Sequence, residues 1–268
     1  MSRKLLALDL DGTAVCDDYS MGEETKKAIA YARSLGHILV FVTGRRDVDM
    51  LTMGRDQWCV DYHLLNTGGK IFRCRDKVVL YNELIEPKVC KRLINHCFQQ
   101  GLQLQIYSGL TWQVTCMTEQ TMEYAKAVGV IPKVIHSLEE TDWQNGLEGF
   151  MASSDWDGVA KFIDAHLPQI YYINSEPGCI DIMASRVSKW NGIVKLAKHL
   201  GIRHEDIITV GNYYNDIEMI QYAAVGIAVA NSLKPVKEKA NYITQKDNNH
   251  DAVAEIIFRM LNHEFDIE

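Results

Sequence analysis

The fold is decided by the stretch Leu5-Leu6-Ala7-Leu8-Asp9-Leu10-Asp11-Gly12-Thr13, close to the start of the chain. Its first four residues form a short, continuously apolar run, which predicts a buried strand of a parallel sheet. In open α/β sheets, ligands bind outside the carboxyl ends of the strands, and Asp9 and Asp11 fall at that edge. Residues two apart share one face of a strand, so we expect the two carboxylates side by side. Gly12 then permits a sharp turn into a loop.

Two carboxylates held together repel each other unless a cation or a shared proton compensates. A hard divalent ion with oxygen ligands, Mg²⁺ first, is therefore expected beside Asp9 and Asp11. The alternative is an ordinary surface turn, because Asp-Gly is common in turns.

The composition limits the classes of protein to which the chain can belong. The chain has 268 residues, enough for one large domain or two modest ones, with 47% hydrophobic and 24% charged residues, as in globular proteins. A net charge of −7 without a long Lys/Arg block disfavours nucleic acid or an anionic membrane as a partner. We see no signal-peptide pattern and no apolar run of roughly 20 residues. The seven cysteines contain no CxxC pair and are typical of reduced thiols, so we expect a cytoplasmic protein.

Helix and strand patterns alternate at both ends of the chain. Ser20 and Glu23 form a potential capping box, which predicts a helix over 23–35. Apolar runs predict further strands over 37–42, 64–66, 207–210 and 226–230, and a final helix is expected over 253–261. This order predicts a doubly wound, Rossmann-like parallel sheet of the α/β class.

The middle of the chain has a different pattern. Helices are expected over 87–100, 118–128 and 157–167, between short strands that follow one another closely, which is typical of a small antiparallel α+β unit. The core is therefore expected to be discontinuous, over 1–82 and 185–268. Residues 83–184 would form an inserted module, about the size of one small domain.

Four motifs in this order resemble those of haloacid dehalogenase-like (HAD) phosphatases of the Cof type, subclass IIB. Asp9-Leu10-Asp11-Gly12-Thr13 is similar to the first motif, Thr43-Gly44-Arg45 to the second and Ser188-Lys189 to the third. Gly211-Asn212-Tyr213-Tyr214-Asn215-Asp216 resembles the GDxxND of the fourth. The resemblance covers nearly the whole chain and implies a HAD core with an inserted α+β cap domain.

The resemblance implies a Mg²⁺-dependent phosphohydrolase that works through an aspartyl-phosphate intermediate. Asp9 would be the nucleophile. Asp11 would protonate the leaving oxygen and then deprotonate the attacking water. The phosphoryl group would be bound by Thr43, Gly44, Lys189 and Asn215, and the metal by Asp9, Asp11, Asn212 and Asp216.

Three of the four phosphate-binding candidates have a structural alternative. Thr43 could merely end a strand, Lys189 could be a solvated residue at a helix start, and Asn215 could cap the following helix. The next two residues after Gly44 are also open: Arg45 and Arg46 could bind an anion, although Arg45 could equally make a structural ion pair.

One residue departs from the family pattern. The family usually has an aspartate where this chain has Asn212, so a metal site here loses a full negative charge. Asp216 remains as a ligand or as a carboxylate behind the ligands. The asparagine at this position has three possible interpretations: an active enzyme with weaker metal binding, a variant that traps substrate, or a catalytically poor relative.

We expect a phosphatase for small phosphorylated metabolites, with sugar phosphates as the leading class by resemblance. A cap over the site leaves little room for a protein or nucleic acid chain, and we expect a monomer or weak homo-oligomer. The alternatives are a phosphomutase and a phosphometabolite-binding relative with little turnover.

Overall fold

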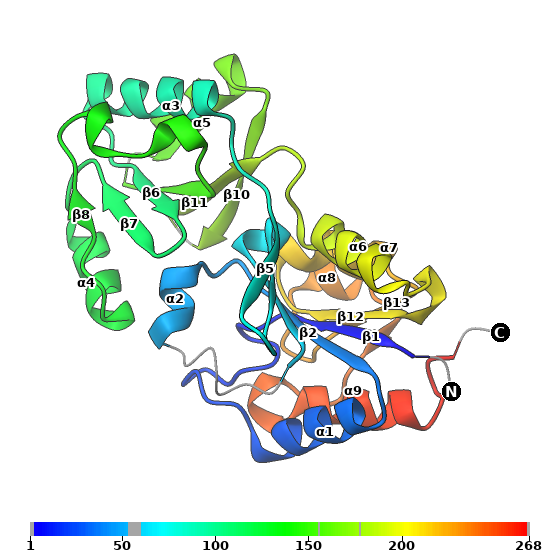
Figure 1. The fold of residues 1–268 in the computed structure, drawn as a ribbon. Coiled ribbons are helices and arrows are strands. Elements are labelled where there is room, and N and C mark those ends of the chain that lie inside the picture. Colours follow the sequence, from blue (N-terminus) through cyan, green and yellow to red (C-terminus); the bar gives the residue numbers. More distant parts are fainter. Residues whose placement is uncertain (1–2, 53–59, 155, 177, 267–268) are drawn as a thin grey trace. The chain divides into compact units, whose positions relative to one another are not determined.

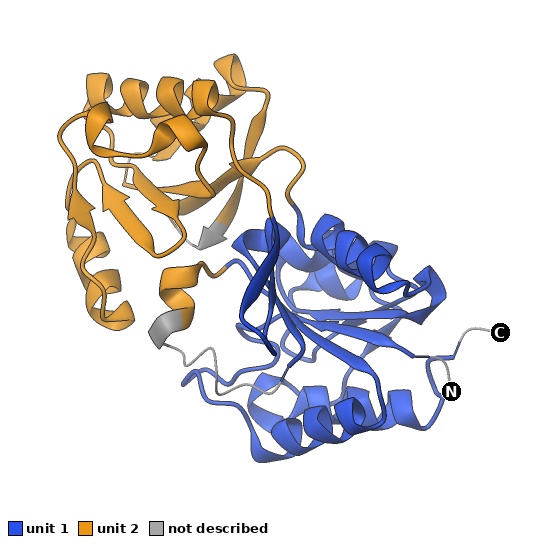
Figure 2. Ribbon diagram, viewed as in Figure 1, with its two compact units in different colours: residues 1–44, 54–81, 188–268 blue, residues 45–53, 82–187 orange. Residues whose placement is uncertain are grey.

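The computed structural model describes residues 3–52, 60–154, 156–176 and 178–266. The chain divides into two compact units (Figure 2): residues 1–44, 54–81 and 188–268 form the first, and residues 45–53 and 82–187 the second. The sequence analysis placed 45–53 with the core, and this segment belongs instead to the second unit.

The first unit is built on an eight-stranded sheet of order β14-β13-β12-β1-β2-β3-β4-β5. Its strands are β1 (Leu5–Leu8), β2 (Ile38–Val42), β3 (Tyr62–Leu65), β4 (Lys70–Arg73), β5 (Val78–Asn82), β12 (Ile207–Gly211), β13 (Val225–Ala228) and β14 (Tyr242–Ile243). Its α-helices are α1 (Glu23–Ser34), α6 (Lys189–Leu200), α7 (Ile217–Tyr222), α8 (Lys234–Lys237) and α9 (Ala252–Leu261). Helices α1 and α9 cover one face of the sheet and α6, α7 and α8 the other (Figure 1), which confirms the predicted doubly wound α/β architecture.

Strand β1 lies in the middle of this sheet because it is apolar on both faces. All four of its residues are fully buried, as expected for a central strand that helices cover on both sides. Leu5 pairs in parallel with Ile207 of β12 and with Ile38 of β2. The carboxyl ends of β12, β1 and β2 therefore lie at one edge of the sheet.

The start of α1 differs from the sequence prediction. The predicted capping box is wrong, because the N-cap is Gly22 and no side chain caps the helix from that position. Instead, Asp251 accepts hydrogen bonds from the Thr25 backbone N–H (3.0 Å) and from the Thr25 hydroxyl (2.8 Å). A Cβ on Gly22 would lie 2.0 Å from Asp251 Oδ1, so this position needs a glycine. A residue from the far end of the chain therefore fixes the helix start.

The edge of the sheet beyond β3 was not predicted either. Strand β4 runs antiparallel to β3, and β5 follows it as the outermost strand. The sheet is therefore mixed, with a parallel centre.

The second unit has its own six-stranded sheet, of order β10-β11-β9-β6-β7-β8. Among its described residues, the β7–β8 pair is parallel and the other pairs are antiparallel. Its strands are β6 (Gln105–Ser108), β7 (Thr111–Val114), β8 (Lys133–Val134), β9 (Gly149–Ser153), β10 (Ile170–Glu176) and β11 (Cys179–Ala184). Its α-helices are α2 (Asp47–Thr52), α3 (Pro87–Gln100), α4 (Glu119–Val128) and α5 (Trp156–His166). Each unit packs around a separate set of buried apolar side chains, and the predicted α+β character of the middle segment is observed.

Arg46 anchors the start of α2 within the second unit. Its guanidinium forms an ion pair with Asp181 of β11, and both side chains are buried. The same guanidinium lies 4.0 Å from the centre of the Tyr107 ring. Asp49 accepts a hydrogen bond from the Arg46 backbone N–H (2.7 Å) and another from the Tyr124 hydroxyl (2.9 Å). The sequence analysis considered anion binding for Arg46 and a structural ion pair for Arg45 alone, and the structure shows a buried ion pair at Arg46.

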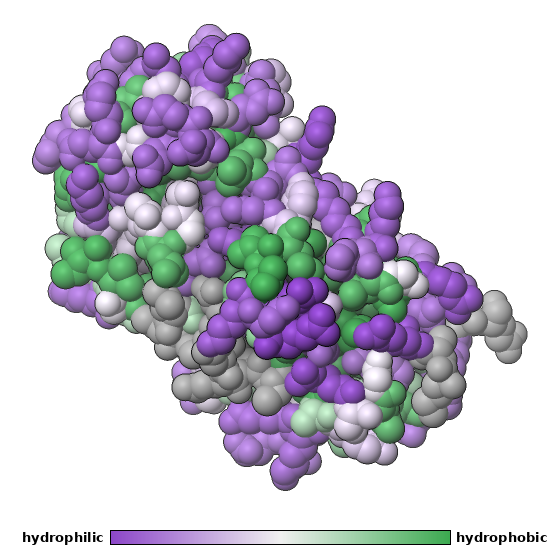
Figure 3. Space-filling model, in the orientation of Figure 1, coloured by the Kyte–Doolittle hydropathy of each residue, from purple (hydrophilic) through white to green (hydrophobic). Residues whose placement is uncertain are grey.

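Polar and apolar side chains interleave over the face drawn in Figure 3. Within the described residues, no helix has both the length and the apolar character needed to cross a bilayer.

The Arg46–Asp181 pair makes the first testable prediction. Removing one partner of a buried ion pair leaves an uncompensated buried charge. We expect Arg46→Met to lower the free energy of unfolding of the second unit by about 3–5 kcal/mol in urea titrations followed by circular dichroism. Lys161→Met is the control, because Lys161 pairs with Asp157 on an exposed face of α5 and should matter little. Equal, small effects of the two substitutions would contradict a stabilising role for Arg46.

Candidate active site

The turn after β1 brings Asp9 to the carboxyl edge of the sheet. The Asp9 backbone N–H still donates to Val210 of β12 (2.9 Å), so the residue continues the strand ladder, and only 5% of its surface is exposed. The Leu10 carbonyl then accepts from the N–H groups of Thr13, Ala14 and Val15 in a tight turn. Asp9 is therefore fixed on a rigid element, while Asp11 begins the turn.

Lys189 connects Asp9 with Asp216, which lies in the loop after β12. It is the first residue of α6, whose N-cap Ser188 accepts a hydrogen bond from the Asn191 N–H (3.1 Å). Its Nζ atom donates to Asp9 Oδ1 and to Asp216 Oδ1, each at 2.6 Å. Lys189 is 1% exposed and Asp216 is fully buried. The solvated alternative for Lys189 is thus excluded, and residues 9, 189 and 216 form one buried cluster.

The charges in this cluster do not balance. Burial and the neighbouring Asp216 raise the pKa of Asp9 to about 7, although Lys189 acts in the opposite direction and Asp11 adds to the rise. Burial alone would lower the pKa of Lys189, but Asp216 and Asp9 outweigh it and hold that pKa above its ordinary value. The ammonium group therefore stays charged, and the carboxylates around it carry the excess charge.

Asp216 shapes the loop that follows β12. Its Oδ2 atom accepts the backbone N–H groups of Asn212 (2.8 Å) and Tyr213 (3.0 Å), while Oδ1 accepts from Lys189. A Cβ on Gly211 would lie 2.4 Å from Asp216 Cγ, so the close approach needs this glycine. Both oxygens of Asp216 are engaged in holding the loop and Lys189.

Asn212 faces the turn after β1. A Cβ on Gly12, which has φ = +69°, would lie 2.3 Å from Asn212 Nδ2. The Asn212 Oδ1 atom is shielded from solvent and has no hydrogen-bond partner within the described residues. Buried polar atoms without a partner are rare in proteins and suggest a missing ion or water.

These oxygen atoms suit a hard divalent cation. Among the described residues, Asn212 Oδ1 has no hydrogen-bond partner. Asp9 and Asp11 add negative charge, and Mg²⁺ prefers such oxygen ligands. No group of three or more His, Cys, Asp or Glu side chains in the described ranges could hold a metal by itself. A cation here would depend on an uncharged ligand such as Asn212 and on water molecules, which Mg²⁺ commonly keeps.

Thr43 and Gly44 follow β2 at the same edge. The buried Thr43 donates its N–H to the Leu64 carbonyl (2.9 Å) and accepts from the Thr67 N–H (3.0 Å). The space next to Gly44 is open, because a Cβ there would meet only Thr67 Oγ1, at 3.7 Å. A ligand could approach the Gly44 backbone from this side.

Asn215 lies in a 3-10 turn, η5 (Tyr214–Asp216), and is half-buried. It does not cap the following helix, because α7 starts at Ile217 and Asp216 occupies its N-cap position. All the predicted site residues therefore lie in the first unit, on the loops after β1, β2 and β12 and at the start of α6.

The sequence analysis assigned no role to the turn after β3, η1 (Asn66–Gly68). Asn66 and Thr67 are both buried, and both have a positive φ. The sequence does contain a signal for this turn, since the adjacent Gly68 and Gly69 follow a predicted strand.

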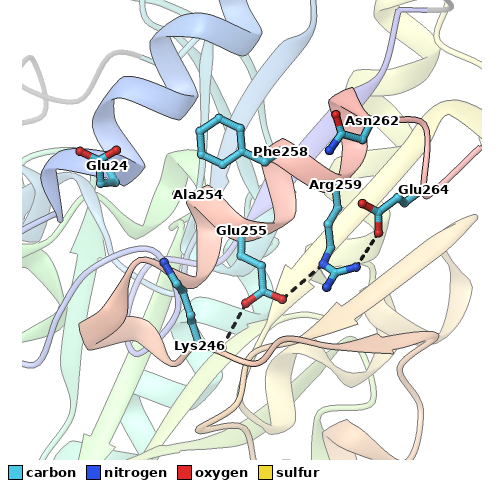
Figure 4. A pocket seen from close by; sticks show the side chains of 8 residues that line it. All are labelled: Glu24, Lys246, Ala254, Glu255, Phe258, Arg259, Asn262 and Glu264. Atoms are coloured by element: carbon cyan, nitrogen blue, oxygen red, sulfur yellow. Dashed lines mark hydrogen bonds and ion pairs between the residues drawn. The ribbon is translucent and has the colours of Figure 1, made fainter.

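A surface hollow of about 360 Å³ lies elsewhere on the first unit (Figure 4). Glu24 of α1, Lys246 and residues of α9 line it. Its arginine, Arg259, is already paired with Glu255 (3.5 Å) and Glu264 (2.5 Å). The hollow contains none of the predicted site residues.

A family model described as haloacid dehalogenase-like hydrolase matches residues 6–257. YxeH of Bacillus subtilis (strain 168) is 27% identical to this chain, over 92% of this chain and 94% of its own. YcsE of the same organism, named a 5-amino-6-(5-phospho-D-ribitylamino)uracil phosphatase, is 25% identical over 95% of this chain and 94% of its own.

Solved structures share the fold. BT4131, described as a HAD subclass IIB sugar phosphatase, superimposes with a TM-score of 0.81 at 22% identity, over 98% of this chain and 99% of its own. The likeness covers both units of the chain.

The raised pKa of Asp9 makes a prediction about the metal-free protein. This pKa of about 7 lies above the value of about 3.9 in an unfolded chain, so the folded state binds the proton more tightly. The contribution of Asp9 to stability is then complete below about pH 4 and is lost as the pH rises to 7. In EDTA, Asp9→Asn should therefore be more stable than the parent at pH 8 and similar to it near pH 4, by urea unfolding. A less stable Asp9→Asn protein at pH 8 would contradict the charge imbalance.

Proposed function

The chain belongs to the haloacid dehalogenase-like hydrolases, and from this premise we propose that it is a Mg²⁺-dependent phosphatase for small phosphorylated metabolites. The family match and the structural likeness confirm the resemblance to HAD phosphatases of the Cof type, and the phosphatase names of its relatives support the enzyme class. Catalysis would proceed through an aspartyl-phosphate on Asp9.

The observation that carries this proposal is the position of Asp9. It is a buried carboxylate directly after the central strand β1, and it accepts a hydrogen bond from the buried ammonium group of Lys189. Attack on phosphorus needs a fixed and oriented nucleophile, which the strand supplies. Lys189 would orient Asp9 and attract the phosphoryl oxygens as a point charge. Asp11, at the start of the turn, would exchange the proton with the leaving oxygen and then with water.

The remaining contacts to the phosphoryl group would come from neutral groups. The space next to Gly44 is open, so its N–H and the neighbouring Thr43 would contact phosphoryl oxygens there, and Asn215 would donate an amide hydrogen bond. Asp9, Asp11 and Asn212 would hold Mg²⁺, while Asp216 positions Asn212 and Lys189 rather than the metal. When bound, Mg²⁺ would offset the negative charge of the carboxylates and of the phosphate.

Sugar phosphates and related polyol phosphates are the proposed substrates. YcsE is named for a phosphoribityl compound and BT4131 as a sugar phosphatase, which supports this class. The second unit would act as the cap, which admits small molecules and excludes a protein or nucleic acid chain. The protein would work in the cytoplasm, as a monomer or weak homo-oligomer.

A second function, binding of a phosphorylated metabolite with little turnover, has one observation in its favour. Asn212 supplies no charge where a carboxylate would hold the metal more tightly. A phosphomutase is the third possibility, and it would release isomerised product with little free phosphate.

Phosphate release tests the proposal directly. We expect a panel of sugar and polyol phosphates to include substrates that release phosphate with Mg²⁺ and not in EDTA. Asp9→Asn should abolish this release and p-nitrophenyl phosphate hydrolysis, because an amide cannot form the phosphorylated intermediate. Circular dichroism should show that the variant is folded. Appreciable hydrolysis by Asp9→Asn would rule out the nucleophile, and tight binding of metabolites without release would favour the binding protein.

Restoring a carboxylate at position 212 makes a separate prediction. Asn212→Asp should tighten Mg²⁺ binding by about tenfold or more, because an anionic oxygen close to a divalent ion adds strong attraction even at an effective dielectric near 20. Turnover at limiting Mg²⁺ should rise with it. If calorimetry gives the parent and Asn212→Asp the same Mg²⁺ affinity, residue 212 does not touch the metal.

A further inference from the structure

The turn after β3 holds its backbone in an unfavourable conformation. Three successive residues have positive φ: Asn66 at 52°, Thr67 at 55° and Gly68 at 88°. Glycine adopts this region freely, but a β-branched residue such as threonine rarely does. Backbone strain of this kind persists where the surroundings impose it, and it is concentrated at active sites and ligand clamps. The positive φ of Thr67 therefore needs a structural or functional explanation.

Two elements of the candidate site hold the turn in this conformation. The Thr67 N–H donates to the Thr43 carbonyl at 3.0 Å. On the other side, a Cβ on Gly68 would lie 2.4 Å from the Ser188 carbonyl oxygen, directly before Lys189. The turn therefore packs against the Thr43–Gly44 segment on one side and against the start of α6 on the other.

The side chain of Thr67 lies next to the open space at Gly44. Its Oγ1 atom is 3.7 Å from the point where a Cβ on Gly44 would be, and no other atom apart from those of the chain neighbours lies within 4 Å of that point in the described structure. Thr67 is 3% exposed, and its Oγ1 atom is not among the solvent-shielded side-chain atoms that lack a hydrogen-bond partner in the described residues. The hydroxyl therefore lies beside the open space, where a ligand bound next to Gly44 could reach it.

We propose that Thr67 is a further substrate-binding residue, whose hydroxyl donates a hydrogen bond to a phosphoryl oxygen bound beside the Gly44 N–H. The proposal rests on the phosphatase function proposed above. A phosphoryl group presents several acceptor oxygens, and Thr67 adds a neutral donor without adding charge to a crowded site. The positive φ is then the backbone conformation that holds this hydroxyl next to Gly44.

The test compares two variants that differ by one oxygen atom. Thr67→Ser and Thr67→Ala both lose the branched methyl group, but only the serine keeps the hydroxyl. With Mg²⁺ present, calorimetric titration with inorganic phosphate should show Thr67→Ser within about threefold of the parent. Thr67→Ala should bind phosphate about tenfold or more weakly, because hydrogen bonds to charged groups are among the stronger ones. KM for p-nitrophenyl phosphate should rise in the same order.

Two further variants separate binding from folding. Thr67→Val keeps the branched shape and removes the hydroxyl, so it should weaken phosphate binding as Thr67→Ala does while unfolding at a urea concentration close to that of the parent. Lys77→Gly relieves a positive φ of 57° in an exposed turn of the same unit and should leave phosphate binding unchanged.

The outcomes distinguish this inference from the function on which it rests. If the parent hydrolyses phosphomonoesters and Thr67→Ala binds phosphate as tightly as Thr67→Ser, the inference is wrong and the phosphatase function stands. If the parent neither binds phosphate nor releases it from any substrate, both fail.

Discussion

The candidate site depends on one buried ammonium group. Lys189 donates to Asp9 and Asp216, and so connects the ends of β1 and β12 through the start of α6. Two buried carboxylates without a cation between them would repel each other and favour protonation. Asp216 in turn fixes the backbone of Asn212 and Tyr213. The position of Lys189 therefore determines where the proposed nucleophile Asp9, the proposed metal ligand Asn212 and the loop after β12 can lie.

The positive charge of Lys189 does not neutralise the carboxylates of Asp9, Asp11 and Asp216. This excess of negative charge suggests a reaction that uses a cation. Burial and neighbouring charge raise the pKa of Asp9 in the protein without a ligand. A divalent cation would offset the excess negative charge and would let a phosphate dianion approach an anionic nucleophile. The Asn212 Oδ1 atom, which has no hydrogen-bond partner in the part of the chain that the structure describes, lies on the loop that Asp216 holds. In the proposed function, this site would hold a cation and a phosphoryl group together, with neutral donors at Thr43, Gly44 and Thr67 around them.

The centre of the fold could be predicted from the sequence, and its long-range contacts could not. The apolar run before Asp9 predicted a buried strand of a parallel sheet, and the polar turns after three strands predicted one edge where they meet. The capping of α1 depends on Asp251, which is 226 residues from Thr25, so no local pattern indicates it. The anchoring of α2 depends similarly on Asp181. Thr67 was missed because strain appears in backbone angles, and the local sequence shows only a glycine-rich turn.

The central claim is that the phosphoryl group is transferred to Asp9 before water releases it. A rapid acid quench with a substrate carrying a radioactive phosphoryl group, followed by proteolysis, would locate the label on the chain. The account predicts label on the peptide that contains Asp9, removable by hydroxylamine as expected for an acyl phosphate, and none in Asp9→Asn. Label on another residue, or turnover with no labelled protein at any quench time, would contradict it.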